Sequence, residues 1–437
     1  MQAKVSAHQF LRSLHALAAH ASDPIELRFE HEAKPQRIRM TSIVGAMPGS
    51  VAPAPLDGAA WVTATVEARI LGVPPATPSA FFHRLAHVMP PVAAAGELEI
   101  NLSRLEEVEG RSRALDRLAF SMDTYQLTAR SAPKALTEPG PEVQRSAMKP
   151  CLSSSAQRLA SAIGCAADWC YGEDDRFHLT GVLLEADGDD TTAVVGCDGH
   201  RLLVQRVRAP WPFGPVSIHR RVAKALAAFL PDAEVTMGLI TPNASERRPP
   251  STTNEGPRCQ PAYLLMDIKS PLHGDLSLVI RTLDITYPPW RLVATLPVER
   301  EHRAYTIGTA RLRRATALGP VIEAKIAHMP RGGKLHEVGD DLLLTMFLVN
   351  EHEEHDNAVT DSLGRFGARG LGPIGLDPSY LHKACEALGD PSTGPGTVSL
   401  LLGGPLDPIM LDGVRYEGLE PGSPETHVRA VIMPRRL

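Results

Sequence analysis

The chain has few of the features that identify secreted, zinc-binding or membrane proteins. Six of its 437 residues are cysteines, and no two of them form a C-x2-C pair of the zinc-binding kind. We therefore expect neither a disulfide framework nor a metal knuckle, and a reducing cytoplasm is the compartment that fits. No run of about 18 apolar residues occurs and no apolar core follows the first residues, so neither a membrane span nor an export signal is predicted.

Positive charge is also in deficit. The chain has 45 Lys and Arg against 50 Asp and Glu, which gives a formal net charge of -5. This balance argues against a protein coated in basic residues. It does not exclude DNA binding, because a protein can concentrate its positive charge on one surface and keep the rest acidic.

The chain does have enough apolar residues for more than one core. Its 437 residues are 43% apolar, and at roughly 150 residues to a domain this length predicts about three domains. A segment rich in Pro, Gly and Glu at 132–141, and another at 297–302, are the predicted linkers. The predicted domains are residues 1–135, 142–298 and 301–437.

A weak internal repeat supports three domains. Six times, a short extended piece leads into an amphipathic helix of about three turns and then into strands. The helices are predicted from apolar side chains at helical spacing: Phe10, Leu11, Leu14 and Leu17; Phe81, Phe82, Leu85 and Val88; Leu159, Ala160 and Ile163; Val222, Leu226, Phe229 and Leu230; Leu312, Ala315 and Leu318; Tyr380, Leu381, Ala384 and Leu388. Apolar runs or alternation predict strands at 98–102, 263–268, 276–281, 342–349 and 398–402. The Pro- and Ser-rich residues 45–58 and 241–261 are expected to be surface loops.

The most informative stretch lies between residues 176 and 204. Two β-rich runs, 176–184 and 192–204, flank an acidic turn at 186–190. The second run is interrupted by the sequence Asp-Gly-His-Arg at 198–201, which is typical of a tight corner. We predict a hairpin followed by a tight turn into a further strand.

Three motifs in this chain resemble one family in the family's own order. Residues 197–202, Cys-Asp-Gly-His-Arg-Leu, resemble the signature of the middle domain of the bacterial DNA polymerase III beta subunit, the sliding clamp, in which Thr or Ser usually stands at position 197. Residues 287–293 are similar to that family's aromatic-Pro-x-aromatic-Arg-x-Val segment. Residues 431–437 resemble its closing apolar-Met-Pro-x-Arg tail. In the first 140 residues the resemblance depends mainly on the order of the repeats.

The resemblance implies both a fold and a function. The implied fold is the α+β, three-domain DNA clamp fold, with six pseudo-repeats whose helices line an inner face and whose antiparallel sheets lie outside, closed into a ring by a head-to-tail homodimer. The implied function is a non-catalytic processivity factor with no cofactor. Such a clamp encircles double-stranded DNA without reading its sequence, and it tethers DNA polymerase, the clamp loader and repair proteins through short apolar motifs.

In the family, those motifs bind in a peptide groove between the second and third domains. Carried over by match, the groove comprises Leu179, Cys197, Gly199, His200, Arg201, Leu202, Pro288, Leu292, Val293, Pro408, Val431, Met433, Pro434 and Arg435. Its apolar residues would form an adaptable slot, and His200 and Arg201 are expected to donate hydrogen bonds at the mouth. Because Cys197 replaces a hydroxyl residue and Leu292 stands where Arg is common, we expect a more apolar groove. For each residue alone, packing in a turn or core is an equally good account.

Basic side chains lie off the apolar stripe of each predicted helix. For one helix, Lys and Arg that keep a surface soluble are the simpler account. If all six helices line one channel, however, these residues would contact phosphates without reading sequence. Together with a loop at 176–178 that resembles the family's DNA-touching loop, the predicted DNA-facing residues are Arg12, Arg84, Arg158, Arg176, Phe177, His178, Arg220, Arg221, Lys224, Arg311, Arg313, Arg314 and Lys383.

Ring closure would bring the first domain of one subunit to the third domain of the other. By position, the expected contacts are Tyr125 and Leu127 with Ala317 and Leu318, although ordinary core or edge packing accounts for them equally well. The first domain lacks the family's Leu-Pro-Ile-Leu-like run, for which residues 23–27 are a poor substitute. This departure favours an alternative, a clamp paralogue that acts as a protein-interaction module without encircling DNA.

Enzymatic alternatives have weaker support. A thiol hydrolase using Cys197, Asp198 and His200 would need residues that are adjacent along a strand and turn to converge. His352 and His355 do not have the H-E-x-x-H spacing of a zinc protease, so a solvated acidic loop is expected there. The Gly-containing segments 331–334 and 367–372 lack the spacing of a phosphate-binding loop, and nucleotide binding is not predicted.

Overall fold

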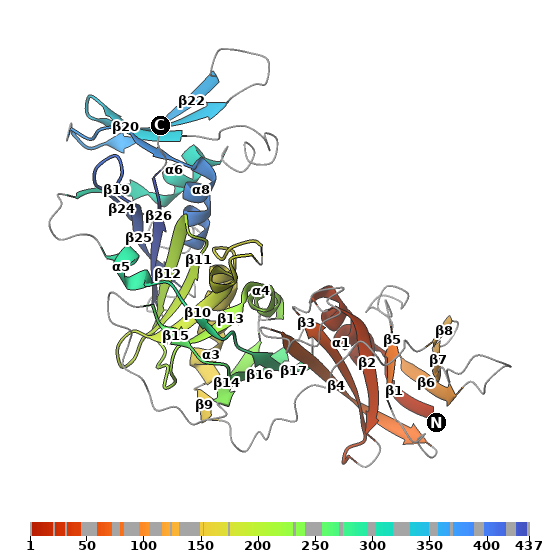
Figure 1. The fold of residues 1–437 in the computed structure, drawn as a ribbon. Coiled ribbons are helices and arrows are strands. Elements are labelled where there is room, and N and C mark those ends of the chain that lie inside the picture. Colours follow the sequence, from red (N-terminus) through yellow and green to blue (C-terminus); the bar gives the residue numbers. More distant parts are fainter. Residues whose placement is uncertain are drawn as a thin grey trace. The chain divides into compact units, whose positions relative to one another are not determined.

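The computed structural model (Figure 1) describes residues 2–20, 22–30, 33–44, 59–71, 79–82, 96–104, 116–122, 125–130, 149–151, 153–173, 175–229, 233–240, 256–270, 274–295, 302–317, 333–348, 357–367, 370–388, 397–416 and 425–434. The chain divides into two compact units. The first consists of Met1–Gly164, Ile218–Glu246 and Gln260–Asp284, and the second of Cys165–Ser217, Arg247–Cys259 and Ile285–Leu437. The three predicted domain boundaries stay a prediction.

The first unit is built on a twelve-stranded sheet in the order β8-β7-β6-β1-β4-β17-β16-β14-β9, and off this path β3 pairs with β4, β2 with β3, and β5 with β2. Its strands are β1 (Gln2–Ser6), β2 (Ser22–Glu30), β3 (Arg37–Val44), β4 (Ala60–Leu71), β5 (Ser79–Phe82), β6 (Glu97–Arg104), β7 (Asp116–Met122), β8 (Tyr125–Arg130), β9 (Lys149–Cys151), β14 (Glu234–Ile240), β16 (Tyr263–Ser270) and β17 (Gly274–Arg281). Helix α1 (Ala7–His20) packs on β3, β4 and β17. It buries its predicted apolar stripe, Phe10, Leu11, Leu14 and Leu17, completely.

Two further helices pack closely on each other. They are α3 (Ser153–Ala167) and α4 (Arg220–Phe229). A Cβ added at Gly164 in α3 would lie 2.3 Å from the Cβ of Ala227 in α4. Because real Cβ contacts are never that short, glycine at 164 is what allows the two helices to approach.

The second unit is built on an eight-stranded antiparallel sheet in the order β13-β10-β11-β12-β26-β25-β24-β19. Its strands are β10 (Gly181–Ala186), β11 (Thr192–Cys197), β12 (Arg201–Val207), β13 (Val216–His219), β19 (Arg303–Gly308), β24 (Thr397–Leu402), β25 (Ile409–Tyr416) and β26 (Glu425–Ile432). Pairing of β12 with β26 joins the hairpin of the central region to the C-terminal strands, and Figure 1 shows the two side by side. One sheet therefore contains both the Asp-Gly-His-Arg corner and the Met-Pro tail.

Smaller elements complete the second unit. A four-stranded sheet has the order β22-β21-β20-β23, and a two-stranded sheet pairs β15 with β18. Their bounds are β20 (Gly333–Val338), β21 (Asp341–Leu348), β22 (Asn357–Arg365), β23 (Ile374–Leu376), β15 (Arg258–Cys259) and β18 (Ile285–Thr286). The helices are η3 (Phe177–Leu179, a 3-10 turn), α5 (Trp290–Ala294), α6 (Thr309–Thr316) and α8 (Pro378–Ala387). Asp377 caps α8, because its carboxylate accepts a hydrogen bond from Ser379 N at 3.0 Å.

Most predicted elements are confirmed. The hairpin, the corner, five of the predicted helices (α1, α3, α4, α6 and α8) and the five predicted strands are present. The predicted helix through Phe81 and Phe82 is wrong over those two residues, because Ser79–Phe82 is extended and pairs with β2. The remainder of that helix lies outside the described residues, as do most of the predicted loops 45–58 and 241–261.

The start of the predicted hairpin also differs. Residues 176–179 were expected to be extended, but Phe177–Leu179 forms a 3-10 turn. Thr180 closes the turn, since both its backbone N–H and its hydroxyl donate to the carbonyl of Phe177, at 3.2 and 2.8 Å. The strand begins at Gly181.

Candidate functional site

The corner between β11 and β12 is held by one carboxylate. Asp198 Oδ1 accepts hydrogen bonds from the backbone N–H groups of His200 and Arg201, both at 2.9 Å, and its Oδ2 accepts a third from Arg201 Nε at 2.7 Å. Gly199 lies between them with φ of +93°, a left-handed conformation that costs an L-residue about 1–2 kcal/mol. These contacts explain why Asp, Gly and Arg occur together in the motif.

The side chain of Arg201 joins the corner to a helix far along the chain. Its guanidinium lies over the ring of Trp169, 5.1 Å from the centroid, and over the ring of Tyr380 in α8, 5.0 Å from the centroid. Nη2 donates to the carbonyl of Asp168 at 2.9 Å. Arg201 is only 7% exposed, which differs from the hydrogen bond at an open mouth that was expected of it. Its main role is to hold the corner against α8.

Strand pairing places the corner next to the C-terminal tail. Arg201 is opposite Ile432 and Leu202 is opposite Val431 in the β12–β26 register. One residue beyond the strand, Met433 N donates to the carbonyl of His200 at 2.8 Å. Two of the three sequence motifs, far apart along the chain, therefore lie in direct contact.

The predicted groove residues differ in exposure. Leu179, Arg201, Leu202 and Val431 are buried, Cys197, Pro288, Pro408 and Pro434 are half-buried, and Gly199, His200, Leu292, Val293 and Met433 are exposed. Arg435 lies outside the described residues. The exposed fractions of the three large apolar side chains are 56% for Leu292, 37% for Val293 and 39% for Met433. Single exposed apolar side chains are common, whereas several that lie together on one surface often mark a binding site.

One further exposed apolar residue was missed from the sequence. Leu406 is 70% exposed on the turn that leads through Pro408 into β25, whose Ile409 pairs with Ile432. Asp407 shapes this turn, because its carboxylate accepts a hydrogen bond from Gly404 N at 2.6 Å. The signal that could have identified Leu406 is a large apolar residue within a Gly- and Pro-rich turn.

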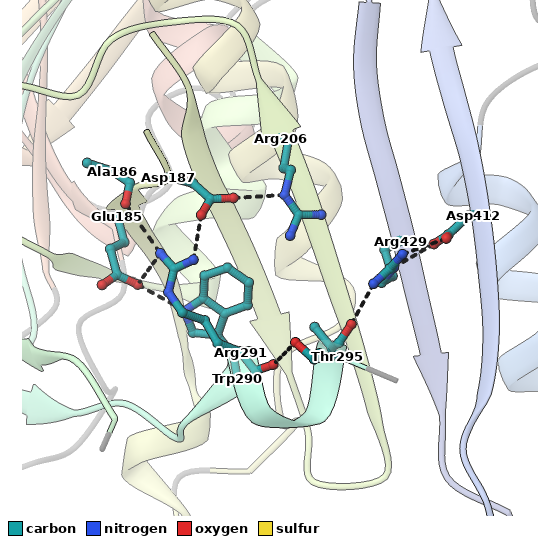
Figure 2. A network of polar contacts seen from close by, with 10 residues as sticks. Glu185, Ala186, Asp187, Arg206, Trp290, Arg291, Thr295, Asp412 and Arg429 are labelled. Atoms are coloured by element: carbon teal, nitrogen blue, oxygen red, sulfur yellow. Dashed lines mark hydrogen bonds and ion pairs between the residues drawn. The ribbon is translucent and has the colours of Figure 1, made fainter. Parts of the chain in front are cut away.

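Helix α5 contains residues 290–293 of the motif at 287–293, and Figure 2 shows polar contacts of this helix. At its start, Trp290 Nε1 donates to the buried carboxylate of Glu185 at 3.0 Å. Arg291 forms an ion pair with Asp187, lies 3.5 Å from Glu185 Oε2, and donates to the carbonyl of Ala186 at 3.3 Å. The beginning of α5 is therefore fixed on the end of β10.

A second arginine, Arg206, also contacts Asp187. Arg206 Nε on β12 donates to its Oδ2 at 2.8 Å. Burial tends to raise the pKa of Asp187, but the hydrogen bonds and charges of Arg291 and Arg206 outweigh it and hold the pKa below its ordinary value. The carboxylate is therefore charged at neutral pH.

The end of α5 is fixed on the C-terminal strands. Arg429 on β26 donates from Nη1 to the carbonyl of Ala294 at 2.6 Å. Its Nε and Nη2 form a fork on the two carboxylate oxygens of Asp412 on β25, each at 2.6 Å. Hydrogen bonding to Asp412 raises the pKa of Arg429 above its ordinary value. Helix α5 thus bridges the hairpin and the C-terminal strands.

The geometry is unsuited to a Cys197 nucleophile. Burial raises the pKa of the Cys197 thiol to about 11, so the thiol is protonated at neutral pH. Both oxygens of Asp198 already accept hydrogen bonds from residues 200 and 201, which leaves that carboxylate committed to the corner. The geometry therefore gives the thiol-hydrolase alternative no support.

The predicted DNA-facing residues lie on several elements. Arg12 is on α1, Arg158 on α3, Arg220, Arg221 and Lys224 on α4, Arg311, Arg313 and Arg314 on α6, and Lys383 on α8. Arg176, Phe177 and His178 are exposed at η3, where Arg176 lies over the ring of Tyr171, 5.1 Å from its centroid. Arg314 is 3.7 Å from Asp361. Arg84 lies outside the described residues.

The predicted dimer contacts are only partly described. Tyr125 and Leu127 belong to β8, at one end of the path of the twelve-stranded sheet. Ala317 is exposed immediately after α6, and Leu318 lies outside the described residues.

Neither a metal site nor a membrane-spanning helix is found in the part of the chain that the structure describes. Within it, no group of three or more His, Cys, Asp or Glu side chains could hold a metal ion. Its helices are all too short or too polar to cross a membrane. His352 and His355 fall outside these residues.

No family model matches this chain, and no curated protein matches its sequence. Its structure matches solved ones over 100% of both chains. These include the DNA polymerase III subunit beta of Pseudomonas aeruginosa, at a TM-score of 0.67 and 16% identity. The DNA polymerase sliding clamp of Caulobacter crescentus matches at 0.66 and 14%, and the Helicobacter pylori beta clamp bound to a DNA ligase peptide matches at 0.64 and 13%. The chain has the fold of these clamps, as the three motifs predicted.

Proposed function

We propose that the chain is a divergent member of the bacterial beta clamp family and a non-catalytic processivity factor for a DNA polymerase. The observation that carries this proposal is the arrangement around α5, which contacts both β12 and β26. It brings together three motifs that are far apart along the chain and leaves Leu292, Val293 and Met433 exposed beside them. Such a surface suits a short peptide that buries a few apolar anchors.

The proposed partner segment is apolar and needs no acidic residue. Arg291 is already paired with Asp187 and Glu185, and the next residue along α5 is Leu292 rather than a cation. Met433 adds a flexible apolar side chain next to β26, and Leu406, which is 70% exposed, adds apolar surface on the turn before β25. Polymerase, clamp loader and repair proteins are the proposed classes of partner. The H. pylori clamp that this chain resembles in fold is bound to a DNA ligase peptide.

The proposed second ligand is double-stranded DNA, and the proposed compartment of the protein is the cytoplasm. Basic side chains on α1, α3, α4, α6 and α8 would contact phosphates and so give affinity without sequence preference. Two subunits would close head to tail around the duplex, using the Tyr125–Leu127 region and the end of α6. Linkage would then be topological, and the clamp would raise the local concentration of a polymerase at the primer end.

Retention on circular DNA tests this function. The protein is loaded on nicked circular DNA with a clamp loader and ATP, washed at high salt, and assayed before and after the circle is cut once. We expect retention on the circle and release after cutting, because only a closed ring is lost from an end.

Two outcomes would reject ring closure and favour the alternative function. One is equal retention on circular and cut DNA, and the other is no retention on either while an apolar peptide still binds. That alternative is a clamp paralogue that binds clamp partners without encircling DNA. If the protein neither binds an apolar peptide nor is retained on DNA, both proposals are contradicted.

A further inference from the structure

Helix α5 is too short to set its own position. It has five residues, Trp290–Ala294, whereas isolated helices shorter than about 12–15 residues are marginal in water. Its place must therefore come from contacts with the rest of the second unit. Those contacts fall at its two ends, and the residues between them, Leu292 and Val293, are the ones left exposed.

The two ends are held by different parts of the sheet. Trp290 and Arg291 are bound by carboxylates at the end of β10. At the other end, the carbonyl of Ala294 is one of the helix-terminal groups that lack a partner inside the helix. Arg429 Nη1 donates to that carbonyl at 2.6 Å. Anchoring at both ends leaves α5 little freedom to rotate.

The guanidinium that holds Ala294 is itself held rigidly. Arg429 and Asp412 are opposite each other in the β25–β26 register, and two parallel hydrogen bonds of 2.6 Å join them. A forked pair fixes the plane of the guanidinium, which a single lysine-type contact would not do. The third donor is thereby aimed at the end of α5.

We propose that Arg429 is a positioning residue for the apolar partner site. By tying Ala294 to the C-terminal strands, it fixes the rotation of α5 and so presents Leu292 and Val293 in the arrangement that a partner segment binds. This inference depends on the proposed peptide site for its effect on affinity. Its effect on α5 itself is independent of any partner. The gain to binding is preorganisation, since α5 does not have to be ordered when the peptide arrives.

Three single variants separate positioning from general stability. Arg429→Met removes every donor and keeps the length of the side chain. Asp412→Asn weakens the fork but leaves the guanidinium free to reach Ala294. Arg365→Met removes an arginine paired with one aspartate, Asp340, at 2.9 Å in the four-stranded sheet, and serves as the matched control.

Three measurements are made on each full-length variant. Hydrogen–deuterium exchange of residues 287–295 reports the order of α5 without any ligand. Fluorescence anisotropy reports the Kd of a fluorescein-labelled heptapeptide that carries two leucines and a phenylalanine. Thermal melting of each variant shows how much stability it has lost.

We expect Arg429→Met to speed exchange in α5 and to weaken peptide binding by about tenfold, since both the order of α5 and its preorganisation depend on that donor. Asp412→Asn weakens the fork that aims the guanidinium but keeps its donor to Ala294, so a loss of about threefold, smaller than in Arg429→Met, is expected. Arg365→Met is expected to change peptide affinity by about twofold or less. Unchanged exchange in Arg429→Met would overturn the inference, as would a loss of affinity that follows the melting temperature across all three variants. Exchange could be faster in Arg429→Met while the natural chain itself binds no peptide. That outcome would keep Arg429 as the residue that positions α5 and would reject the peptide site.

Discussion

The corner at 198–201 and helix α5 are neighbours in the same sheet unit, but they are stabilised over very different distances along the chain. In the corner, the donors to Asp198 come from two and three residues away. In α5, the partner of Trp290 is 105 residues away and the partner of Ala294 is 135 residues away. Contacts of the first kind can be inferred from the motif itself. Contacts of the second kind cannot, because the motif at 287–293 does not contain the partners of Trp290 and Ala294.

The largest effect is expected where the local contacts are removed. Asp198→Ala takes away the acceptor for three hydrogen bonds and leaves the charge of Arg201, only 7% exposed, without its carboxylate. We expect a loss of about 3–5 kcal/mol in the free energy of unfolding, measured by urea titration, because a buried charge is left unpaired.

Asp340→Ala is the control for that substitution. It removes an exposed carboxylate from its pair with Arg365, for which about 1 kcal/mol or less is expected. Similar losses in the two variants would show that the corner is not held by Asp198.

A smaller loss of stability with a larger loss of binding is expected at α5. Arg291→Met leaves Glu185 with Trp290 and Asp187 with Arg206, so each carboxylate keeps one partner. The expected cost is roughly 2–3 kcal/mol in urea unfolding. Because the start of α5 is released, affinity for the apolar heptapeptide should fall by more than in Asp198→Ala at the same folded fraction. The opposite order would mean that the corner, rather than α5, determines binding.

The backbone of the corner gives the next effect. Gly199→Ala places a Cβ at φ of +93°, with its nearest neighbours at an ordinary 3.6 Å. The cost is therefore backbone strain alone, about 1–2 kcal/mol. Gly172→Ala, where the added Cβ meets nothing within 4 Å and φ is not left-handed, is the comparison and should be within about 0.5 kcal/mol of the natural chain. Equal melting temperatures for the two variants would contradict a strained corner.

The smallest effect is a pH dependence at α5. The pKa of Asp187 in the folded protein lies below its ordinary value of 3.8, so the unfolded chain binds the proton more readily. The stability that this carboxylate contributes is therefore present above pH 3.8 and is lost as the pH falls through the folded pKa. The difference in free energy of unfolding between the natural chain and Asp187→Asn should be constant from pH 7 to 5 and shrink below about pH 4. If the difference in free energy of unfolding grew on acidification, the pKa of Asp187 would be raised in the folded protein rather than lowered.

The sequence predicted those parts of the site whose causes are local or periodic. Asp198 and Gly199 could be read as a tight corner, and the apolar stripe of α1 could be read at helical spacing. Phe81 and Phe82 also fitted helical spacing, but their backbone pairs with β2, in the register Ile25 with Phe82. Pairing between distant strands thus outweighed a short local pattern.

The remaining features of the site had no local signal. Nothing around Arg429 distinguishes it from any other arginine in a strand, and its fork on Asp412 is a consequence of the β25–β26 register. From the sequence alone Arg201 would be expected to be exposed, but in the fold its guanidinium packs over the rings of Trp169 and Tyr380. Long-range packing of this kind depends on the assembled sheet, which one sequence without its fold does not specify.

The pairing of β12 with β26 also sets the order in which the protein can mature. Residues 201–207 leave the ribosome long before residues 426–432, to which they pair. Domains usually fold as they emerge, at roughly 5–20 residues per second, yet the edge of β12 must wait unpaired for the rest of that interval. Until β26 arrives, neither the His200–Met433 contact nor the Arg429 anchor exists. A nascent chain would thus lack the proposed peptide site, and the edge of β12 would stay open to other strands until residues 426–432 emerge.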